Sequence, residues 1–394
     1  MRKLFQKCSP GGDSVDYMLD NLRIDTASLV YDLLKPYAVE EFWEFKDCVP
    51  VSGSTYVIGR QQLLENLDLV RQMAVSPDYT MIFDGAAEGS WTLQQELQSF
   101  KITDLVLSGH LLVIGGGDMP NDYLYMKHDY FINVFLGYEH NLQQMTRIDE
   151  LYNQPDKPYK FLFLNGSART HRKYLWQRFR QMGLLDQALW TMLDSRPVRW
   201  GKMQLIENGV DLFGEITPIQ HLPSKYEYIQ YRDTTITLDP SERKFVKHDL
   251  FQNTWGEVYL QAEPYRDTYF SVVTETVFGE SNHSFRTEKI VKPLAMGHPW
   301  IAVANAGYYR DLRNLGFQTF SHVIDEGFDQ IDSPQDRAER IITIVDDLCQ
   351  QDLASFLDSC YNVCKYNQQH LIELREQIRT QFPERFWQFL QQHQ

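Results

Sequence analysis

The sequence predicts an α/β protein with two domains, each built on a parallel sheet that helices cover. Its 394 residues exceed the size at which one hydrophobic core usually stops growing. Helical and strand patterns alternate along the chain, as they do in parallel sheets covered on both faces. A polar segment with two prolines, residues 152–158, has the composition of a domain linker. We therefore expect domains at 1–155 and 156–375, and a closing helix at 376–394 that could pack back on the first domain.

In the first domain, Arg60–Ala74 has the apolar spacing of an amphipathic helix, and it leads into the apolar strand Tyr79–Phe83. Two Gly-containing loops, 84–90 and 115–118, each follow a strand. Ligands gather at the carboxyl ends of strands in open α/β sheets, so both loops are candidate ligand-facing segments. The other elements expected in this domain are helices at Leu29–Leu34 and Trp91–Phe100 and a strand at Leu111–Ile114.

The second domain opens with a buried-strand pattern, Lys160–Leu164, then a Gly-containing turn and a helix at Lys173–Met182. This order opens a nucleotide-binding α/β unit. The turn lacks the GxGxxG and P-loop patterns, so a dinucleotide or ATP site has no motif support. We interpret residues 200–255 as including substrate-facing loops around a short strand, Thr234–Leu238. The remaining expected elements are strands at Phe270–Phe278 and Trp300–Ala304 and helices from Thr287 and at Tyr308–Leu315, Gln335–Cys349, Leu353–Phe382 and Pro383–Leu390.

The helix expected after Phe278 has an unusual start, Thr287-Glu288-Lys289. Thr287 is a good N-cap, and Glu288 suits the positive end of the helix dipole. Lys289 opposes the dipole at a cost of about 0.3–1 kcal/mol, which is explained if Lys289 faces an anion that the helix end also attracts. A phosphate group would satisfy both. The alternative is an ordinary ion pair between Lys289 and Glu275 or Glu288.

The composition argues against several classes of protein. A net charge of −15 is unsuited to a general nucleic-acid binder, so any phosphate contact must be local. The five cysteines form no CxxC pair and predict neither a disulfide framework nor a zinc site. No apolar segment has the length of a signal sequence or a membrane span, so we expect a cytoplasmic protein. Peripheral association with a membrane through a surface patch stays compatible with this composition.

Three features follow one another in the second half of the chain: Glu275, then Thr287-Glu288-Lys289, then Gly297-His298-Pro299-Trp300. In this order they resemble glycosyltransferases of the GT-B architecture, in particular the fucosyltransferase and exostosin-like group. The resemblance covers residues 160–332, and the first domain matches no family pattern. It implies two Rossmann-like domains that face a cleft, with the second domain holding most of a donor nucleotide.

The resemblance implies a role for each charged residue of this site. Lys289 would contact donor phosphate, and Glu275 or Glu288 would hold ribose or sugar hydroxyls. Arg169 and Arg172 would add positive charge at the same sheet edge, because arginine can bind phosphate oxygens in bidentate fashion. The alternative for both arginines is a charge on the helix surface. The candidate donor-binding residues are Asn165, Arg169, Arg172, Glu275, Thr287, Glu288 and Lys289.

An inverting transferase also needs a carboxylate or histidine that takes the proton of the acceptor hydroxyl. The candidates are Asp84, Glu88 and Asp118, because each lies in a Gly-containing loop directly after a strand of the first domain. Asp84 ranks first, and its alternative role is a turn residue that caps the next helix. His128-Asp129 ranks lower, because adjacent strand residues point to opposite faces. No metal-ligand cluster is readable, so we expect metal-independent transfer without a cofactor.

Two features depart from the family pattern. Pro293 lies within the helix that starts at Thr287 and should kink it. His298-Pro299 is also similar to the His-Pro element of bacterial sialyltransferases, which would imply a CMP-linked donor. Its alternative is a turn proline beside a structural histidine.

The expected function is transfer of a sugar from a GDP-, UDP- or CMP-linked donor to a hydroxyl group of a glycan or protein acceptor. One alternative is a GT-B-like protein that binds nucleotide sugar without turnover, and another is a sialyl- or Kdo-type transferase with a CMP-sugar donor. A nucleotide-sugar epimerase or a phosphohydrolase ranks behind these, because the sequence shows neither a dinucleotide fingerprint nor a metal-ligand cluster.

Overall fold

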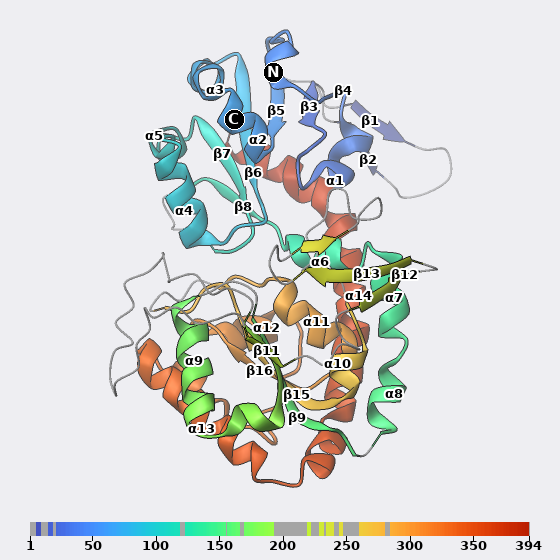
Figure 1. The fold of residues 1–394 in the computed structure, drawn as a ribbon. Helices are drawn as coiled ribbons and strands as arrows, with labels where there is room; N and C mark the ends of the chain where they lie inside the picture. The colour runs from blue at the N-terminus through green and yellow to red at the C-terminus, as the bar shows by residue number, and fades with distance from the viewer. Residues whose placement is uncertain are drawn as a thin grey trace. The chain divides into compact units, whose positions relative to one another are not determined.

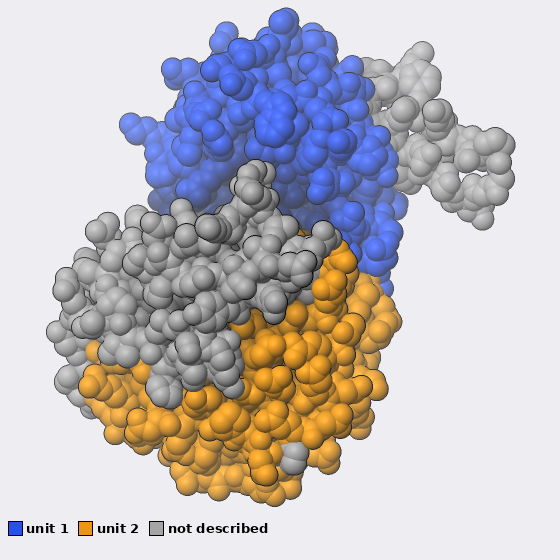
Figure 2. All heavy atoms as spheres, turned by 45° about the vertical axis from the view of Figure 1, so that its right-hand side comes forward, with its two compact units in different colours: residues 1–133, 283–285, 374–394 blue, residues 134–282, 286–373 orange. Residues whose placement is uncertain are grey.

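The computed structural model describes residues 5–8, 15–18, 21–118, 123–154, 156–165, 169–192, 219–221, 228–231, 234–239, 244–246, 260–279 and 284–393. The chain forms two compact units, which Figure 2 shows in different colours. Unit 1 comprises residues 1–133, 283–285 and 374–394, and unit 2 comprises residues 134–282 and 286–373. Each unit contains a mainly parallel sheet with helices, so both are Rossmann-like α/β structures.

The sheet of unit 1 has six parallel strands in the order β4-β3-β5-β6-β7-β8 (Figure 1). Chain order reverses once, between β3 and β5, which is the flavodoxin-like arrangement. The strands are β3 Leu22–Asp25, β4 Glu40–Phe42, β5 Ser54–Ile58, β6 Tyr79–Gly85, β7 Leu111–Gly115 and β8 Tyr125–Lys127, and a separate antiparallel pair is formed by β1 Phe5–Cys8 and β2 Val15–Met18.

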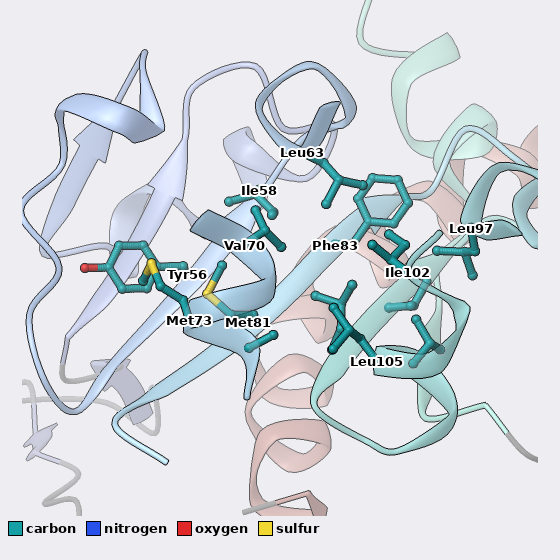
Figure 3. Close-up of a cluster of buried hydrophobic side chains, with 14 of the residues drawn as sticks. Tyr56, Ile58, Leu63, Val70, Met73, Met81, Phe83, Leu97, Ile102 and Leu105 are labelled. Atoms are coloured by element: carbon teal, nitrogen blue, oxygen red, sulfur yellow. The ribbon is translucent and has the colours of Figure 1, made fainter. Parts of the chain in front are cut away.

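Helices cover both faces of this sheet. Alternate residues of β6 enter different hydrophobic clusters, Met81 and Phe83 in one and Ile82 in the other, because successive side chains in a strand point to opposite faces. The first cluster, drawn in Figure 3, includes side chains of the segment that holds α2 Arg60–Glu65, α3 Leu67–Ala74, α4 Ser90–Ser99 and α5 Thr103–Leu107.

The opposite face is covered by α1 Tyr31–Leu34 and by the last turns of α14 Leu353–Gln392. Phe382, Phe386 and Phe389 of α14 are buried there, and their spacing puts them on one face of the helix. The C-terminal residues of the chain therefore complete the core of unit 1.

The sheet of unit 2 has the order β11-β10-β9-β15-β16, in which β11 is antiparallel and the other four strands are parallel. Chain order again reverses once, between β9 and β15. The strands are β9 Tyr159–Asn165, β10 Ala188–Met192, β11 Ile219–His221, β15 Thr268–Thr274 and β16 Trp300–Val303. A second, antiparallel sheet consists of β12 Tyr228–Tyr231, β13 Thr234–Asp239 and β14 Lys244–Val246. The substrate loops expected within 200–255 otherwise lie outside the described residues.

Helix ends follow local sequence rules in unit 2. The Thr287 side chain accepts a hydrogen bond from the Lys289 N–H and caps α11 as expected, and Ser333 caps α13 ahead of Pro334. Figure 1 shows α9 beside α13, and Arg178 of α9 pairs with Glu339 of α13. The helices are α6 Tyr130–Phe135, α7 Glu139–Met145, α8 Ile148–Tyr152, α9 Thr170–Gln181, α10 Glu263–Arg266, α11 Glu288–Met296, α12 Tyr308–Asn314 and α13 Pro334–Cys349, and the 3-10 segments are η1 Lys35–Tyr37, η2 Phe45–Asp47, η3 Leu184–Gln187 and η6 Glu326–Gln330.

Three predicted elements differ from the structure. The helix expected over Arg60–Ala74 breaks at Asn66, whose side chain donates to the Gln62 carbonyl and so competes with the helical ladder. The strand expected to reach Phe278 ends at Thr274. The two helices expected on either side of Pro383 are one helix, α14. None of the helices in the described ranges has the length and apolar character needed to span a membrane.

Candidate functional site

The candidate site of unit 2 lies where the strand order of its sheet reverses, at the carboxyl ends of β9 and β15. Asn165 is the last residue of β9, and Thr274 is the last residue of β15. The Thr274 hydroxyl donates to Asn165 Oδ1 at 2.7 Å and joins the two strand ends. Ligands of open α/β sheets bind at such a reversal point. The sequence alone did not reveal that these two strands are neighbours.

Glu275 follows Thr274 directly and is 1% exposed. Its carboxylate accepts hydrogen bonds from the Thr287 N–H at 3.1 Å, the Thr287 hydroxyl at 2.6 Å and the Tyr308 hydroxyl at 2.8 Å. Such donors offset the cost of burying a carboxylate. Glu275 thereby fixes the starts of α11 and α12 against the end of β15. The geometry favours this holding role over contact with sugar hydroxyls.

Lys289 forms the ion pair that was the alternative to phosphate contact, and its partner is Glu288. Lys289 Nζ lies 2.5 Å from Glu288 Oε1 and 3.3 Å from the Thr287 hydroxyl. Burial opposes ionisation of Glu288, but the adjacent Lys289 and then Lys292 outweigh it and hold the pKa of that carboxyl below its ordinary value. The Lys289 side chain is still 27% exposed, so the pair orients the lysine without removing it from the surface.

Arg169 and Arg172 lie at the N-terminus of α9, just after β9. Arg169 is the N-cap residue, and its side chain makes no capping hydrogen bond. Arg172 is buried, and its Nη2 donates to the carbonyls of Thr274 and Glu275 at 3.1 and 3.2 Å. Its alternative as a surface charge is therefore wrong, because it ties α9 to the end of β15.

His171 was not predicted from the sequence. The shift of its pKa shows which charged side chains lie near it in the site. It is buried, and its Nε2 lies 3.0 Å from the Glu275 carbonyl. Burial and then the nearby charges of Arg172, Arg169 and Lys289 hold the pKa of His171 well below its ordinary value. The imidazole is neutral at physiological pH. Three cationic side chains therefore act on one ring at this edge of the sheet, next to the carboxylates of Glu275 and Glu288.

Two buried arginines of the same region were also missed. Arg286 precedes Thr287 and its charge acts on Tyr308. Arg337 lies on the apolar face of α13, 4.6 Å over the Phe278 ring, and it donates to the Gly279 carbonyl at 2.6 Å. An arginine on the buried stripe of an amphipathic helix is a signal that could have identified the second. Arg337 holds the segment after β15 against the sheet, which explains why Phe278 is buried outside the strand.

His298 lies at the opposite edge of the sheet. Its ring contacts the Ser271 hydroxyl at 2.9 Å and the Thr268 carbonyl at 2.9 Å, and burial lowers its pKa to about 3. Thr268 is the first residue of β15, whereas Lys289 lies beyond the carboxyl end of that strand. The geometry favours the structural histidine of a turn, with Gly297 in the left-handed conformation at φ 62° ending α11.

In unit 1, Asp84 is 2% exposed at the end of β6. Its carboxylate accepts hydrogen bonds from the Ser28 hydroxyl at 2.5 Å, the Val30 N–H at 3.0 Å and the Ala86 N–H at 3.1 Å. Burial raises its pKa. Asp25, missed in the sequence, binds the Gly59 N–H in the same way at 2.9 Å. These contacts favour the turn-stabilising alternative for Asp84.

The other two candidate acids are less buried. Asp118 pairs with Lys127 at 2.6 Å, and its side chain is 35% exposed. Glu88 is half-buried, and its carbonyl accepts from the Gly116 N–H at 3.0 Å. Both therefore keep partial access to solvent at the carboxyl edge of the sheet.

The glycines of these two loops have a packing role. A Cβ at Gly89 would press on Phe285, one at Gly116 would overlap the Ala86 carbonyl, and one at Gly117 would crowd the Ser284 carbonyl. Phe285 is buried in unit 1, with its ring 6.1 Å from that of Phe131. The loops are glycine-rich because an aromatic ring lies against their backbone.

No set of three or more histidine, cysteine, aspartate or glutamate side chains within the described ranges is arranged to hold a metal ion. Comparison of the chain with protein-family models, with curated proteins and with solved structures gave no match. The glycosyltransferase resemblance therefore stays a prediction that rests on the residues themselves.

Proposed function

We propose that this protein is a GT-B-like glycosyltransferase that moves a sugar from a nucleotide-activated donor to a hydroxyl group of a glycan or protein. The donor phosphates would bind where the strand order of the unit 2 sheet reverses. The observation that supports this most is the gathering of Arg169, Arg172 and Lys289 around the buried His171, at the carboxyl ends of β9 and β15. Cationic side chains at one sheet edge suit a phosphate ligand, which a chain of net charge −15 could bind only locally.

This arrangement suits the chemistry of glycosyl transfer. Negative charge grows on the leaving phosphate as the glycosidic bond breaks, and fixed cations and helix N-termini stabilise it. Lys289 is oriented by Glu288, and the start of α11 is fixed by Glu275. Both contacts hold the lysine in place before a ligand arrives, which reduces the reorganisation needed in the reaction.

Three acidic residues are proposed as the general base that takes the proton of the acceptor hydroxyl group. Glu88 and Asp118 are better placed than Asp84, because the Asp84 oxygens already bind Ser28, Val30 and Ala86. This observation also supports the second candidate function, a nucleotide-sugar-binding protein without turnover. The position of His298 at the amino edge of the sheet gives no support to a CMP-sugar donor.

Thermal unfolding with GDP-, UDP- and CMP-sugars tests the proposal. A ligand at a hundredfold excess over its dissociation constant stabilises the folded state by about 2.7 kcal/mol. We therefore expect the sugar donors of one nucleotide base to raise the Tm. We expect Lys289→Ala to abolish that rise, and Lys292→Ala, a matched change on the same helix, to preserve it. An equal rise in the Lys289→Ala variant would exclude the proposed site.

Measurement of nucleotide release then separates the two functions. A transferase releases nucleotide from the stabilising donor in the presence of acceptor glycans, and Glu88→Gln or Asp118→Asn should slow that release. A binding protein shows the same thermal shift with no release from any donor.

A further inference from the structure

The side-chain amide nitrogen of Asn165 differs from the other polar groups of the site in its hydrogen bonding. Asn165 is 1% exposed, and its Nδ2 has no hydrogen-bond partner within the part of the chain that the structure describes. Buried side-chain amides in folded proteins almost always have a partner, so an unpartnered one calls for an explanation. A hydrogen bond to a ligand oxygen would provide one.

The rest of Asn165 is fully used by its neighbours on the adjoining strands. The Thr191 hydroxyl of β10 accepts from the Asn165 N–H at 2.9 Å and donates to its carbonyl at 3.2 Å. The Thr274 hydroxyl of β15 donates to Oδ1 at 2.7 Å. With Oδ1 held by Thr274, the amide presents its NH₂ group as the only unused donor of the side chain.

The surroundings of this donor indicate the charge of the missing acceptor. Arg169 is the N-cap residue of α9, a twelve-residue helix, and its side chain makes no capping hydrogen bond. Helix N-termini attract anions, and the half-buried Arg169 lies at this one. By contrast, the Thr287 hydroxyl already accepts from the first turn of α11.

We propose that Asn165 Nδ2 donates a hydrogen bond to a phosphate oxygen of the ligand, with Thr274 as the residue that positions the amide. The phosphate subsite is then the start of α9, and Lys289 contacts the same ligand from α11. This inference adds a phosphate-binding residue to the proposed function and rests on that function for the identity of the nucleotide. The phosphate contact itself can be tested independently.

The test is isothermal titration calorimetry of the full chain with inorganic pyrophosphate and with GDP, UDP and CMP. The variants are Asn165→Asp, Asn165→Ala, Thr274→Val and Thr274→Ser. Asn165→Asp keeps the shape but replaces the donor by a negative oxygen, so pyrophosphate affinity should fall at least tenfold. Asn165→Ala should lower it about tenfold, the loss of one charge-assisted hydrogen bond.

Substitutions of Thr274 distinguish a residue that positions the Asn165 amide from one with a purely structural role. Thr274→Val should weaken pyrophosphate binding severalfold, and Thr274→Ser, which restores the hydroxyl, should recover affinity to within about twofold. The apo unfolding temperature of each variant shows whether it folds. A loss of affinity in a variant that unfolds at the wild-type temperature supports the proposal.

Two outcomes overturn the inference: unchanged pyrophosphate and nucleotide affinity in both Asn165 variants, or no binding of any of the four probes by the wild type. Pyrophosphate binding that depends on Asn165, without binding of any nucleotide sugar, would instead reject the proposed function and leave the phosphate subsite standing. Binding that Lys289→Ala abolishes but Asn165→Asp leaves intact would place the phosphate at α11 and refute this assignment.

Discussion

Glu275 organises the site through three hydrogen bonds to two elements, α11 through Thr287 and α12 through Tyr308. A buried carboxylate in this position stabilises the fold only while its hydrogen-bond donors are present. The buried donors in turn require the carboxylate as their acceptor. Removing one partner leaves the others buried and unsatisfied. The glycosyltransferase resemblance implied a ligand contact for Glu275, whereas in this geometry Glu275 keeps the site assembled.

We expect Glu275→Ala to lower the free energy of unfolding by about 3 kcal/mol or more, since it leaves the Thr287 N–H and the Tyr308 hydroxyl without their acceptor. Urea denaturation measures the change. Glu263→Ala is the control: its partly exposed pair with Arg147 should contribute about 1 kcal/mol. Equal losses in the two variants would contradict the structural role of Glu275.

At the residue scale, sequence reasoning identified which side chains share a sheet edge but not what each one contacts. Thr287 could be predicted as a cap, because capping depends on residues three positions apart at most. The partners of Asp84 and Arg172 could not be predicted, because Ser28 and Thr274 reach them only through the tertiary fold. Long-range contacts of this kind decide whether an acid or a cation serves a ligand or the protein.

At the scale of elements, strands with continuous apolar runs, such as β7 and β9, were predictable, as was α13, which was expected at Gln335–Cys349. The continuity of α14 through Pro383 was not. Proline inside a helix costs about 3 kcal/mol. Burial of Phe382 and Phe386 on either side offsets this, and each side chain contributes about 1.5–3 kcal/mol. Tertiary burial therefore overrides the local signal for a break.

The loops after β6 and β7 are a second case in which local sequence was misleading. Their glycines suggested a surface for ligands, whereas Gly89, Gly116 and Gly117 lie against Phe285. A glycine where backbone meets a ligand and a glycine where backbone meets a ring have the same sequence signature. Only the position of Phe285, far along the chain, distinguishes them.

We expect Gly116→Ala to destabilise unit 1 by about 1–3 kcal/mol, because the new methyl group would overlap the Ala86 carbonyl and press on Phe285. Gly279→Ala, where a Cβ would have no neighbour within 4 Å, serves as the control and should change the Tm little. The measurement is thermal unfolding followed by circular dichroism. A neutral Gly116→Ala would mean that the two loops are not packed in this way.

At the scale of the whole molecule, both units share a sheet in which chain order reverses once. The alternation of helices and strands predicted this class of fold. The order of the strands could not be predicted, because a parallel sheet has no short turns that show which strands are neighbours. Residues 374–394 belong to unit 1, and the sequence had already indicated that a closing helix at 376–394 could pack back on the first domain.

Unit 1 should lose stability in mild acid because of His128. The ring is 0% exposed beside Phe382, and neither nitrogen has a hydrogen-bond partner among the described residues. Burial lowers its pKa from 6.5 to about 4. Between these two pKa values the unfolded state binds a proton that the folded state does not bind. The free energy of unfolding is therefore largest above pH 6.5 and falls by about 3 kcal/mol as the pH approaches 4.

His128→Leu should flatten this part of the pH profile, because it removes the titrating group and keeps the site apolar. Urea denaturation of both proteins at pH 7.5, 6, 5 and 4.5 measures the difference. A stability difference between wild type and variant that stays constant across these pH values would contradict the assignment.

The burial of Phe382, Phe386 and Phe389 in unit 1 also sets the order in which this protein can mature during translation. The ribosome delivers β3 through β8 early, but the helix that covers one face of their sheet emerges only after all of unit 2 has been made. Until then the part of that sheet face that α14 covers stays exposed, the kind of apolar surface from which nascent chains aggregate. The nascent chain should therefore depend on chaperones over most of its synthesis.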